Sequence, residues 1–517
     1  MRSTASETRA PRGRSSARAL VVLCAALSLT VFGLGSAAAQ STLTIGVDAE
    51  TSSMDPRQSG TVANQNIMTL LHVPLLVWDE ELNIVPMLAE SIENPDDRTY
   101  HITLREGLTF HDGTEITSED VAYTYDGLRD PDGGYLGLSF YRDIESIETP
   151  DRYTVVLTLA EPSSPFIYYL NHGIVPKHYV EEVGDEAFSS EPLGSGPFQF
   201  VEWVTGERVV LEAYDDWFEG RPEIDRLVLR PITDTTVRRI ELETGGVDLV
   251  DRIDPLDVER LDLDPAVDVT RSPSARYENL GISTRLGPLE DVLVRRALAH
   301  MIPKSDIVEF ILDGVGQVGN SPIVAESWAH DPDVGFPYDP ERGAELLAEA
   351  GYADGFETEL IIRPDPINRQ VAELIQQELG RHGNIDVAVS EIESASFFER
   401  LAEGTVPMWI AGWGALADPD RGVYRQFHSR NHPPAGPNRQ FYENERADEL
   451  MDLARTTTDF DERRAYYLEL QEIVVDDASY VILYYPEVIS AASPDLEGFA
   501  YDPFHHFLGL KDASLNR

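Results

Sequence analysis

Residues 357–392, "ETELIIRPDPINRQVAELIQQELGRHGNIDVAVSEI", contain the pattern that decides the fold class. The apolar stretches at its two ends predict strands, and the segment between them predicts a helix. Ile367, Val371, Leu374 and Ile375 recur at the spacing of one helical face. A strand, a helix and a second strand in this order favour a parallel pair joined by a crossover helix. This unit predicts an α/β protein.

The next segments continue the same alternation. "ASFFERLAEG" at 395–404 predicts a helix, and "VPMWIAGW" at 406–413 predicts a strand. The stretch "AGWGALADPD" at 411–420 then lies at the carboxyl end of that strand, which is the edge where open α/β sheets bind ligands. It contains no reactive group, and Gly412 and Gly414 leave the Trp413 ring uncovered on both sides. These features favour recognition over catalysis.

The first half of the chain is rich in strands. "RTYHITLR" and "YTVVLTLA" alternate apolar and polar residues, and "FQFVEWVTGERVVLEAY" predicts a hairpin around Thr205 and Gly206. In "TSEDVAYTYDGL", Thr117 is placed to cap a helix while Asp120 reaches back to it. With 517 residues and halves of different character, the chain is expected to form two unequal lobes.

Charge narrows the range of partners. Asp and Glu outnumber Lys and Arg by 91 to 41, which gives a net charge of −50. Such a field repels phosphate backbones and anionic lipids, so we expect no nucleic acid partner and no membrane-surface binding. Lysine occurs only at Lys177, Lys304 and Lys511. Adaptation to high salt and an arginine-favouring genome both explain this composition, and the choice between them stays open.

Residues 1–39 have the pattern of a secretory signal peptide. Five arginines precede the apolar run "ALVVLCAALSLTVFGLG", and Ala37 and Ala39 frame a cleavage site before Gln40. Cys24 follows Leu23, which does not fit a lipoprotein signal. We therefore expect export to the periplasm without lipidation, and a mature chain without cysteine.

Three shorter motifs have simpler structural explanations. "GVGQVG" at 314–319 follows a predicted helix where a dinucleotide site needs a strand, so we expect a helix-ending loop. His428 and His432 stand before two prolines, which favours a loop over a metal-binding helix face. "PLGSGPF" at 192–198 lacks the pattern of a nucleophilic serine. We expect no catalytic residues, no metal and no cofactor.

Longer blocks carry a resemblance to a known family. "LLVWDEELNIVPMLAESIENPDDRTYHITLREGLTFHDGTEITSEDVAYTYDGL" at 75–128 resembles the family 5 extracellular solute-binding proteins of ABC importers, the dipeptide, oligopeptide and nickel group. The resemblance continues in order from about residue 42 to 500. Its further blocks are "GIVPKHYVEEVG", "PLGSGPFQFVEW", "WFEGRPEIDRLVLRPITD", "DVLVRRALAHMIPKSDIV" and "YDPERGAELLAEAGY".

The resemblance implies a two-lobed, hinged periplasmic-binding-protein fold. Lobe I would comprise residues 40–278, with an extra subdomain at about 80–194, together with the C-terminal return at 487–517. Lobe II would comprise residues 279–486. The chain would cross between the lobes near "YENLGIST" and near "YYPEVIS", forming a hinge that closes on the solute.

The resemblance also implies a ligand site. Peptide binders of this family carry a Gly-Trp pair followed, three residues later, by an Asp that pairs with the α-ammonium of the peptide. Gly412 and Trp413 match the pair, but Leu416 stands at the Asp position and Asp418 comes two residues later, before Pro419. Asp418 either turns towards the ligand or caps the turn. The expected ligand-binding residues are Trp413, Gly414, Leu416, Asp418, Met54, Asn279 and Tyr485.

These observations predict a monomeric, exported solute-binding protein that delivers a peptide-like solute to ABC permease subunits in the inner membrane. A non-peptide solute, such as an oligosaccharide, an opine-like conjugate or a metal chelate, is the alternative within the fold. A secreted hydrolase would need a nucleophile or a paired acid and base, and no motif supplies them.

Overall fold

A computed structural model of the chain describes residues 40–58, 62–79, 83–131, 133, 135, 138–414, 418–501 and 504–517. Residues from Thr42 onward form one compact unit, distinct from residues 1–41. The predicted signal peptide and Leu416 lie outside the described residues. In the part of the chain that is described, no helix combines the length and apolarity needed to cross a bilayer.

The first sheet has seven strands in the order β12-β19-β11-β1-β10-β9-β8. The central strand β1 pairs in parallel with β10 and β11. β8 and β9 form the predicted hairpin, which turns at Gly206 with a φ of 73°. The strands are β1 (Thr42–Val47), β8 (Phe198–Val204), β9 (Arg208–Ala213), β10 (Arg226–Pro231), β11 (Leu249–Val250), β12 (Asp268–Pro273) and β19 (Glu487–Ala492).

The second sheet has six strands in the order β14-β18-β13-β17-β15-β16. In it β15 runs parallel to both β16 and β17, while β13 is antiparallel to both of its neighbours. The strands are β13 (Arg276–Ile282), β14 (Gln317–Val318), β15 (Glu357–Ile362), β16 (Asp386–Glu391), β17 (Met408–Gly414) and β18 (Tyr480–Tyr485).

The predicted crossover unit is confirmed by β15, α10 (Pro366–Gly383) and β16. The Asp365 side chain accepts a hydrogen bond from the Asn368 N–H at 2.8 Å and caps the start of α10. Asn384 ends the helix in the left-handed conformation, with a φ of 51°. Val371 and Ile375 are fully buried, as their helical spacing predicts.

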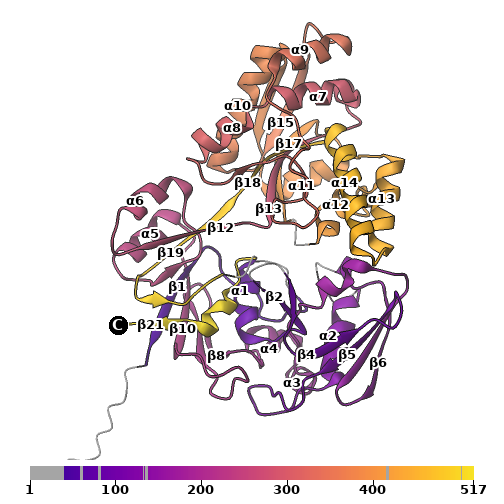
Figure 1. Cartoon of the computed structure of the whole chain (residues 1–517). Coiled ribbons are helices and arrows are strands. Elements are labelled where there is room, and N and C mark those ends of the chain that lie inside the picture. Colours follow the sequence, from indigo (N-terminus) through magenta and orange to yellow (C-terminus); the bar gives the residue numbers. More distant parts are fainter. Residues whose placement is uncertain are drawn as a thin grey trace, which may run out of the picture. The chain divides into compact units, whose positions relative to one another are not determined.

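Helices cover both faces of the second sheet (Figure 1). One hydrophobic core packs α7, α9 and α10 against Leu280 and Met408. The other packs α11 to α14 against Tyr277 and Trp409. Side chains alternate along β17, so Trp409, Ala411 and Trp413 all face the second of these cores. The helices are α7 (Val292–Met301), α9 (Pro340–Glu349), α11 (Ser394–Glu403), α12 (Pro419–Phe427), α13 (Glu445–Thr456) and α14 (Phe460–Asp476).

A separate four-stranded sheet, in the order β4-β5-β7-β6, lies within residues 89–159. It packs against α2 (Ser118–Arg129), whose predicted capping box is present: the Thr117 N–H donates to Asp120 Oδ2 at 2.9 Å. The strands are β4 (Ala89–Glu93), β5 (Thr99–Leu104), β6 (Ile144–Asp151) and β7 (Thr154–Leu159).

Most of the remaining elements are short. "GVGQVG" forms the expected turn after a helix, with Gly314 and Gly316 at positive φ, and leads into β14. The elements not yet given are α1 (Val62–Leu71), α3 (Lys177–Val183), α4 (Asp185–Ser190), α5 (Thr235–Glu243), α6 (Val258–Asp262), α8 (Lys304–Asp306), β2 (Leu76–Trp78), β3 (Ile84–Pro86), β20 (Leu496–Glu497) and β21 (Ser514–Leu515), with 3₁₀-helices η1 (Leu138–Phe140), η2 (Ser164–Tyr169), η3 (Pro255–Asp257), η4 (Gly287–Glu290), η6 (Ser429–Asn431) and η7 (Phe507–Asp512) and the π-helical turn η5 (Ile307–Ile311).

The chain passes between the first and second sheets at two adjacent points (Figure 1). It leaves β12 for β13 through Ser274 and Ala275, and it returns from β18 to β19 through Pro486. The two connections touch, because the Ser274 N–H donates to the Pro486 carbonyl at 3.2 Å. The predicted lobe boundaries at 278 and 486 remain predictions.

Candidate ligand-binding pocket

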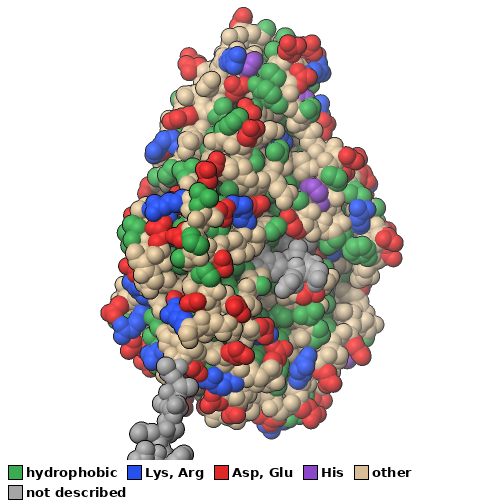
Figure 2. Space-filling view, turned by 60° about the vertical axis from the view of Figure 1, so that its left-hand side comes forward, with side chains coloured by type: hydrophobic (Ala, Val, Ile, Leu, Met, Phe, Trp, Pro, Cys, Tyr) green, Lys and Arg blue, Asp and Glu red, His purple; other side chains and the backbone are tan. Residues whose placement is uncertain are grey.

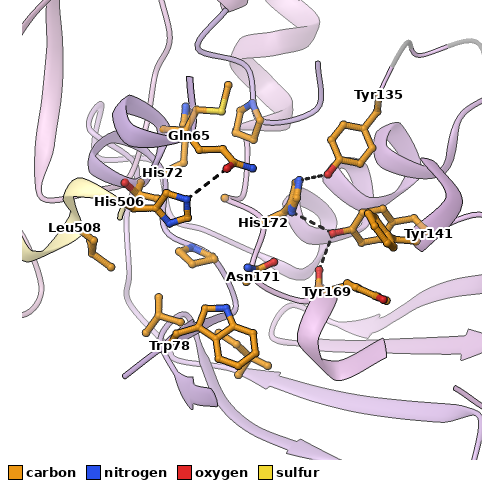
Figure 3. A pocket seen from close by; sticks show the side chains of 18 of the residues that line it. Gln65, His72, Trp78, Tyr135, Tyr141, Tyr169, Asn171, His172, His506 and Leu508 are labelled. Carbon is orange, nitrogen blue, oxygen red and sulfur yellow. Dashed lines mark hydrogen bonds between the residues drawn. The ribbon is translucent and has the colours of Figure 1, made fainter. Parts of the chain in front are cut away.

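A pocket of about 110 Å³ opens where α1, β2, η1 and the end of η2 meet α12 (Figure 3). Most of its described lining is aromatic or apolar, and the polar groups there are hydroxyls, imidazoles, amides and one guanidinium. Its lining residues are Pro56, Gln65, Met68, Thr69, His72, Pro74, Leu76, Val77, Trp78, Tyr135, Phe140, Tyr141, Tyr169, Asn171, His172, Gly173, Arg421, His506 and Leu508.

A chain of hydrogen bonds fixes one wall of this pocket. Figure 3 shows the Tyr135 and Tyr141 hydroxyl groups directed at the His172 ring, 2.6 Å from Nε2 and 3.1 Å from Nδ1. Tyr141 has a single hydroxyl proton, and it donates this to the Tyr169 carbonyl at 2.7 Å. His172 Nδ1 therefore carries the proton that Tyr141 accepts, and Nε2 accepts from Tyr135. The wall is held by a neutral imidazole of defined tautomer.

Burial keeps two of the pocket histidines, His72 and His172, uncharged. It lowers the pKa of His172 to about 4 and that of His72 to about 3, because desolvation disfavours the imidazolium. His72 Nε2 lies 3.2 Å from the Met54 carbonyl, which fixes the ring. At neutral pH these side chains present hydrogen-bonding groups and flat faces rather than positive charge.

Aromatic rings complete the same side. Trp78 stacks on Tyr168 with ring centroids 5.3 Å apart and an interplanar angle of 6°. Phe140 packs on Tyr169 at 4.6 Å. Fixed aromatic faces of this kind bind apolar or planar ligand groups at little entropic cost.

The charge at the pocket comes from α12, which packs on the second sheet through Val423 and Phe427. The Arg421 guanidinium lines the pocket and lies 4.7 Å from the Phe140 ring centroid. Among the described residues that line the pocket, none carries a carboxylate. The pocket therefore combines apolar and aromatic walls with one positive group.

Trp413 lies beside this group at the end of β17. Its indole Nε1–H donates to the Arg421 carbonyl at 3.0 Å, and the Arg425 guanidinium lies 5.6 Å from its ring centroid. The ring is half-buried, so the expectation of an indole uncovered on both sides is wrong. The cause is that β17 extends through Gly414 and turns Trp413 towards the core of α11 to α14.

Asp418 is buried at the start of α12. One carboxylate oxygen accepts from the Asp420 N–H at 3.0 Å, which caps the helix as the turn alternative predicts. The carboxylate also accepts two hydrogen bonds from Arg463 on α14, at 2.7 and 2.8 Å. This bidentate pair, with both side chains at most 6% exposed, neutralises the charge of Asp418.

Comparison with known proteins identifies the fold that holds this pocket. Residues 83–434 match the sequence profile of bacterial extracellular solute-binding proteins, family 5 Middle. The chain belongs to this family.

Relatives and solved structures extend the match beyond those residues. Heme-binding protein A of Haemophilus influenzae is 29% identical over 454 residues, covering 82% of each chain. Glutathione-binding protein GsiB of Salmonella typhi is 28% identical over 486 residues, covering 91% of this chain and 94% of its own. The structure of the oligopeptide-binding protein AppA of Bacillus subtilis, in complex with a nonapeptide, superposes with a TM-score of 0.79 at 27% identity, covering 92% of this chain and all of that one.

The other predicted contact residues of this solute-binding protein lie in the cores or at a strand edge. Met54 is fully buried and Tyr485 is 4% exposed, with its hydroxyl donating to the Ser321 carbonyl at 2.7 Å. The Asn279 amide is buried within β13, where it is placed to bond the Ala411 carbonyl. Gly414 is exposed, with open space around its Cα. Ligand contact by any of them stays a prediction.

The motifs set aside in the sequence have structural roles in this solute-binding protein. Ser195 of "PLGSGPF" is buried, and its hydroxyl accepts from the Val73 N–H at 3.2 Å. His428 is buried at the end of α12, where its Nδ1 accepts from the Arg430 N–H. Over the described ranges, no three His, Cys, Asp or Glu side chains group closely enough to hold a metal ion.

Sequence reasoning missed most of the pocket. Tyr135, Tyr141, His172 and Arg421 meet from segments far apart in the chain, and no short motif joins them. One local signal was available: "FIYYLNHG" at 166–173 crowds aromatic and polar side chains into eight residues, which is unusual for a simple surface turn.

Proposed function

We propose that this solute-binding protein is the substrate-binding component of an ABC importer and captures a peptide-like solute in the pocket beside α12. The observation that carries this proposal is that the residues lining the pocket come from two different parts of the fold. Trp78, Tyr135 and His172 come from segments that pack with the first half of the chain, whereas Arg421 comes from a helix of the second sheet. A hinge at the two crossings would bury a solute between them, which couples binding to closure.

The relatives support a peptide-like solute with scope for variation. Their names refer to heme, glutathione and oligopeptides, so one architecture accommodates ligands of different size and chemistry. An aromatic pocket with few polar anchors is consistent with such a range. A non-peptide solute remains the alternative within the family.

Several finer features belong to the same proposal. Residues 1–39 would direct export to the periplasm and be removed, leaving an unlipidated monomer that contacts the permease subunits. Binding would involve no bond chemistry, no cofactor and no nucleic acid. Trp413, Gly414 and Leu416 would contribute to the solute-facing surface of the second sheet, with Met54, Asn279 and Tyr485 as further candidates. Asp418 would act indirectly, by fixing the start of α12.

Native mass spectrometry of the protein after gentle purification tests this function, followed by calorimetry with a dipeptide and tripeptide library. We expect a retained small molecule with amide bonds and saturable binding by members of the library. A retained solute without amide bonds, together with no binding across the library, would move the protein to the non-peptide alternative.

A further inference from the structure

Two arginines of α12 lack carboxylate partners among the described residues, although the chain has 91 acidic and 41 basic residues. Arg455 and Arg463, on the neighbouring helices α13 and α14, each pair with an aspartate of α12. Across the described ranges, Arg421 and Arg425 make no ion pair and donate no side-chain hydrogen bond.

The two guanidinium groups lie together at the pocket. Residues four apart on a helix share a face, and both groups lie over the Phe140 ring, at 4.7 Å for Arg421 and 5.2 Å for Arg425. Arg421 lines the pocket directly. Arg425 also lies over Trp413, so the pair spans the space between η1 and the end of β17.

This placement is electrostatically unfavourable. Both side chains are half-buried, and burial together with the positive charge of Arg421 lowers the pKa of Arg425. Like charges four residues apart on a helix repel each other, and each loses part of its hydration. Contact with Phe140 offsets part of this cost, since a guanidinium over an aromatic ring is attracted by the ring's negative face.

The two carboxylates at the start of α12 are already engaged. Asp418 accepts two hydrogen bonds from Arg463, and Asp420 lies 3.5 Å from Arg455. Both aspartates are 3% exposed. The described residues therefore supply neither an anion for Arg421 and Arg425 nor a free acid at the start of α12 for a ligand ammonium.

We propose that Arg421 and Arg425 form a carboxylate receptor, and that the solute is an acidic peptide-like compound whose apolar part occupies the aromatic pocket. The inference rests on the proposed solute-binding function and specifies its substrate class. A carboxylate placed between two guanidinium groups receives charge-assisted hydrogen bonds in the planar geometry that arginine favours. It also removes the repulsion between the two cations.

The test uses matched acidic and neutral probes: N-acetyl-glutathione with its diethyl ester, and N-acetyl-Glu-Glu amide with N-acetyl-Gln-Gln amide. Calorimetry compares the full-length mature protein with the double variant Arg421→Gln/Arg425→Gln. The control, Arg342→Gln/Arg446→Gln, removes the same charge from exposed, paired arginines of α9 and α13. Arg421→Lys/Arg425→Lys keeps the charge but loses the planar fork.

We expect the wild type to bind an acidic probe about 10- to 100-fold more tightly than its neutral partner, because a hydrogen bond to a charged group contributes about 1.5–3 kcal/mol. The glutamine double variant loses this preference, the lysine variant retains part of it, and the control matches the wild type. Thermal melting verifies that each variant is folded.

Equal binding of acidic and neutral probes would overturn the acidic substrate class while leaving the peptide-binding function intact. If the glutamine variant loses affinity for acidic and neutral probes equally, the two arginines serve a cation–aromatic contact with Phe140, and the inference is likewise overturned.

If no probe binds, the solute that stays bound through purification is the deciding observation. An acidic, non-peptide solute that the glutamine variant fails to retain supports the receptor and overturns the peptide-like class; a solute without an acidic group overturns both.

Discussion

The carboxylate of Asp418 shows how a distant residue determines what a side chain does. Its position before Pro419 gave two alternatives, a ligand contact or a helix cap. The cap depends on the adjacent residues and could be predicted. The bidentate pair with Arg463 depends on a residue of α14, and sequence spacing gave no sign of it.

The Asp418–Arg463 pair predicts a large effect on stability. We expect Asp418→Asn to lower the free energy of unfolding by about 3–5 kcal/mol, because it leaves a buried guanidinium without its counter-charge. Chemical denaturation measures this, with Asp143→Asn as a control at an exposed pair. An unchanged unfolding midpoint would show that Arg463 finds another partner. It would also make Asp418→Asn a clean probe of ligand binding.

His172 predicts a contribution to stability that depends on pH. Its pKa is lowered to about 4 in the folded protein, whereas an unfolded histidine titrates near 6.5. Its contribution is therefore present above pH 6.5 and is lost as the pH falls towards 4, by about 1.4 kcal/mol per pH unit.

We expect His172→Gln to be less stable than the wild type at pH 7, because the bonds to Tyr135 and Tyr141 are weakened. At pH 4.5 the difference in unfolding free energy between the two proteins is smaller by about 2–3 kcal/mol. The reason is that only the wild type has the histidine whose protonation reduces stability as the pH falls. Denaturation curves at the two pH values measure it, with the same substitution at the exposed His101 as a control for the loss of an imidazole. A gap of constant size would contradict the assigned pKa.

At the scale of elements, the strand predicted at 406–413 continues one residue further, through Gly414. Gly412, Trp413 and Gly414 pair with Glu278, Tyr277 and Arg276 of β13. A Cβ on Gly412 would lie 2.1 Å from Glu278 Oε1 and 2.3 Å from Arg276 Nη2. The absent side chain makes room for the Arg276–Glu278 ion pair.

We expect Gly412→Ala to lower the free energy of unfolding by about 1 kcal/mol, because the ends of the Arg276 and Glu278 side chains must move to admit a methyl group. Gly414→Ala is the matched control on the same strand, since a Cβ there meets nothing within 4 Å. Equal melting temperatures for the two variants would contradict the close approach at Gly412.

The elements that sequence predicted are those whose signals are local. The capping box of α2, the crossover unit of β15, α10 and β16 and the period-two strands β5 and β7 each depend on neighbouring residues. The pocket could not be found in this way. Tyr135 and His172 are 37 residues apart, and Arg421 reaches Phe140 from a helix that packs on the second sheet. The position of Leu416 suggested an altered peptide site, but no local pattern indicated the unpaired arginines.

On the scale of the whole molecule, negative charge dominates. Figure 2 shows acidic side chains spread over the visible face, with basic groups between them. Removal of residues 1–39 would take the net charge from −50 to −54, because five arginines and one glutamate are lost. Repulsion among so many like charges opposes the compact state, and salt screens it.

We expect the melting temperature to rise steeply as the salt concentration increases from about 0.01 M to 1 M, over which the screening length falls from about 30 Å to about 3 Å. Thermal melting in potassium chloride measures this. A constant melting temperature would mean that local ion pairs already balance the surface, and would leave codon usage as the explanation for the scarcity of lysine.

The paired crossings at Ser274 and Pro486 have a mechanical consequence. A single connecting strand would let one half of a molecule swivel freely about its bonds. Here two connectors run side by side, joined by the Ser274–Pro486 hydrogen bond and flanked by the register pairs Pro273–Glu487 and Glu278–Tyr484. We expect two such parallel connectors to bend readily in one direction and to resist twisting about their length. Motion between the two sheets would then follow a single axis.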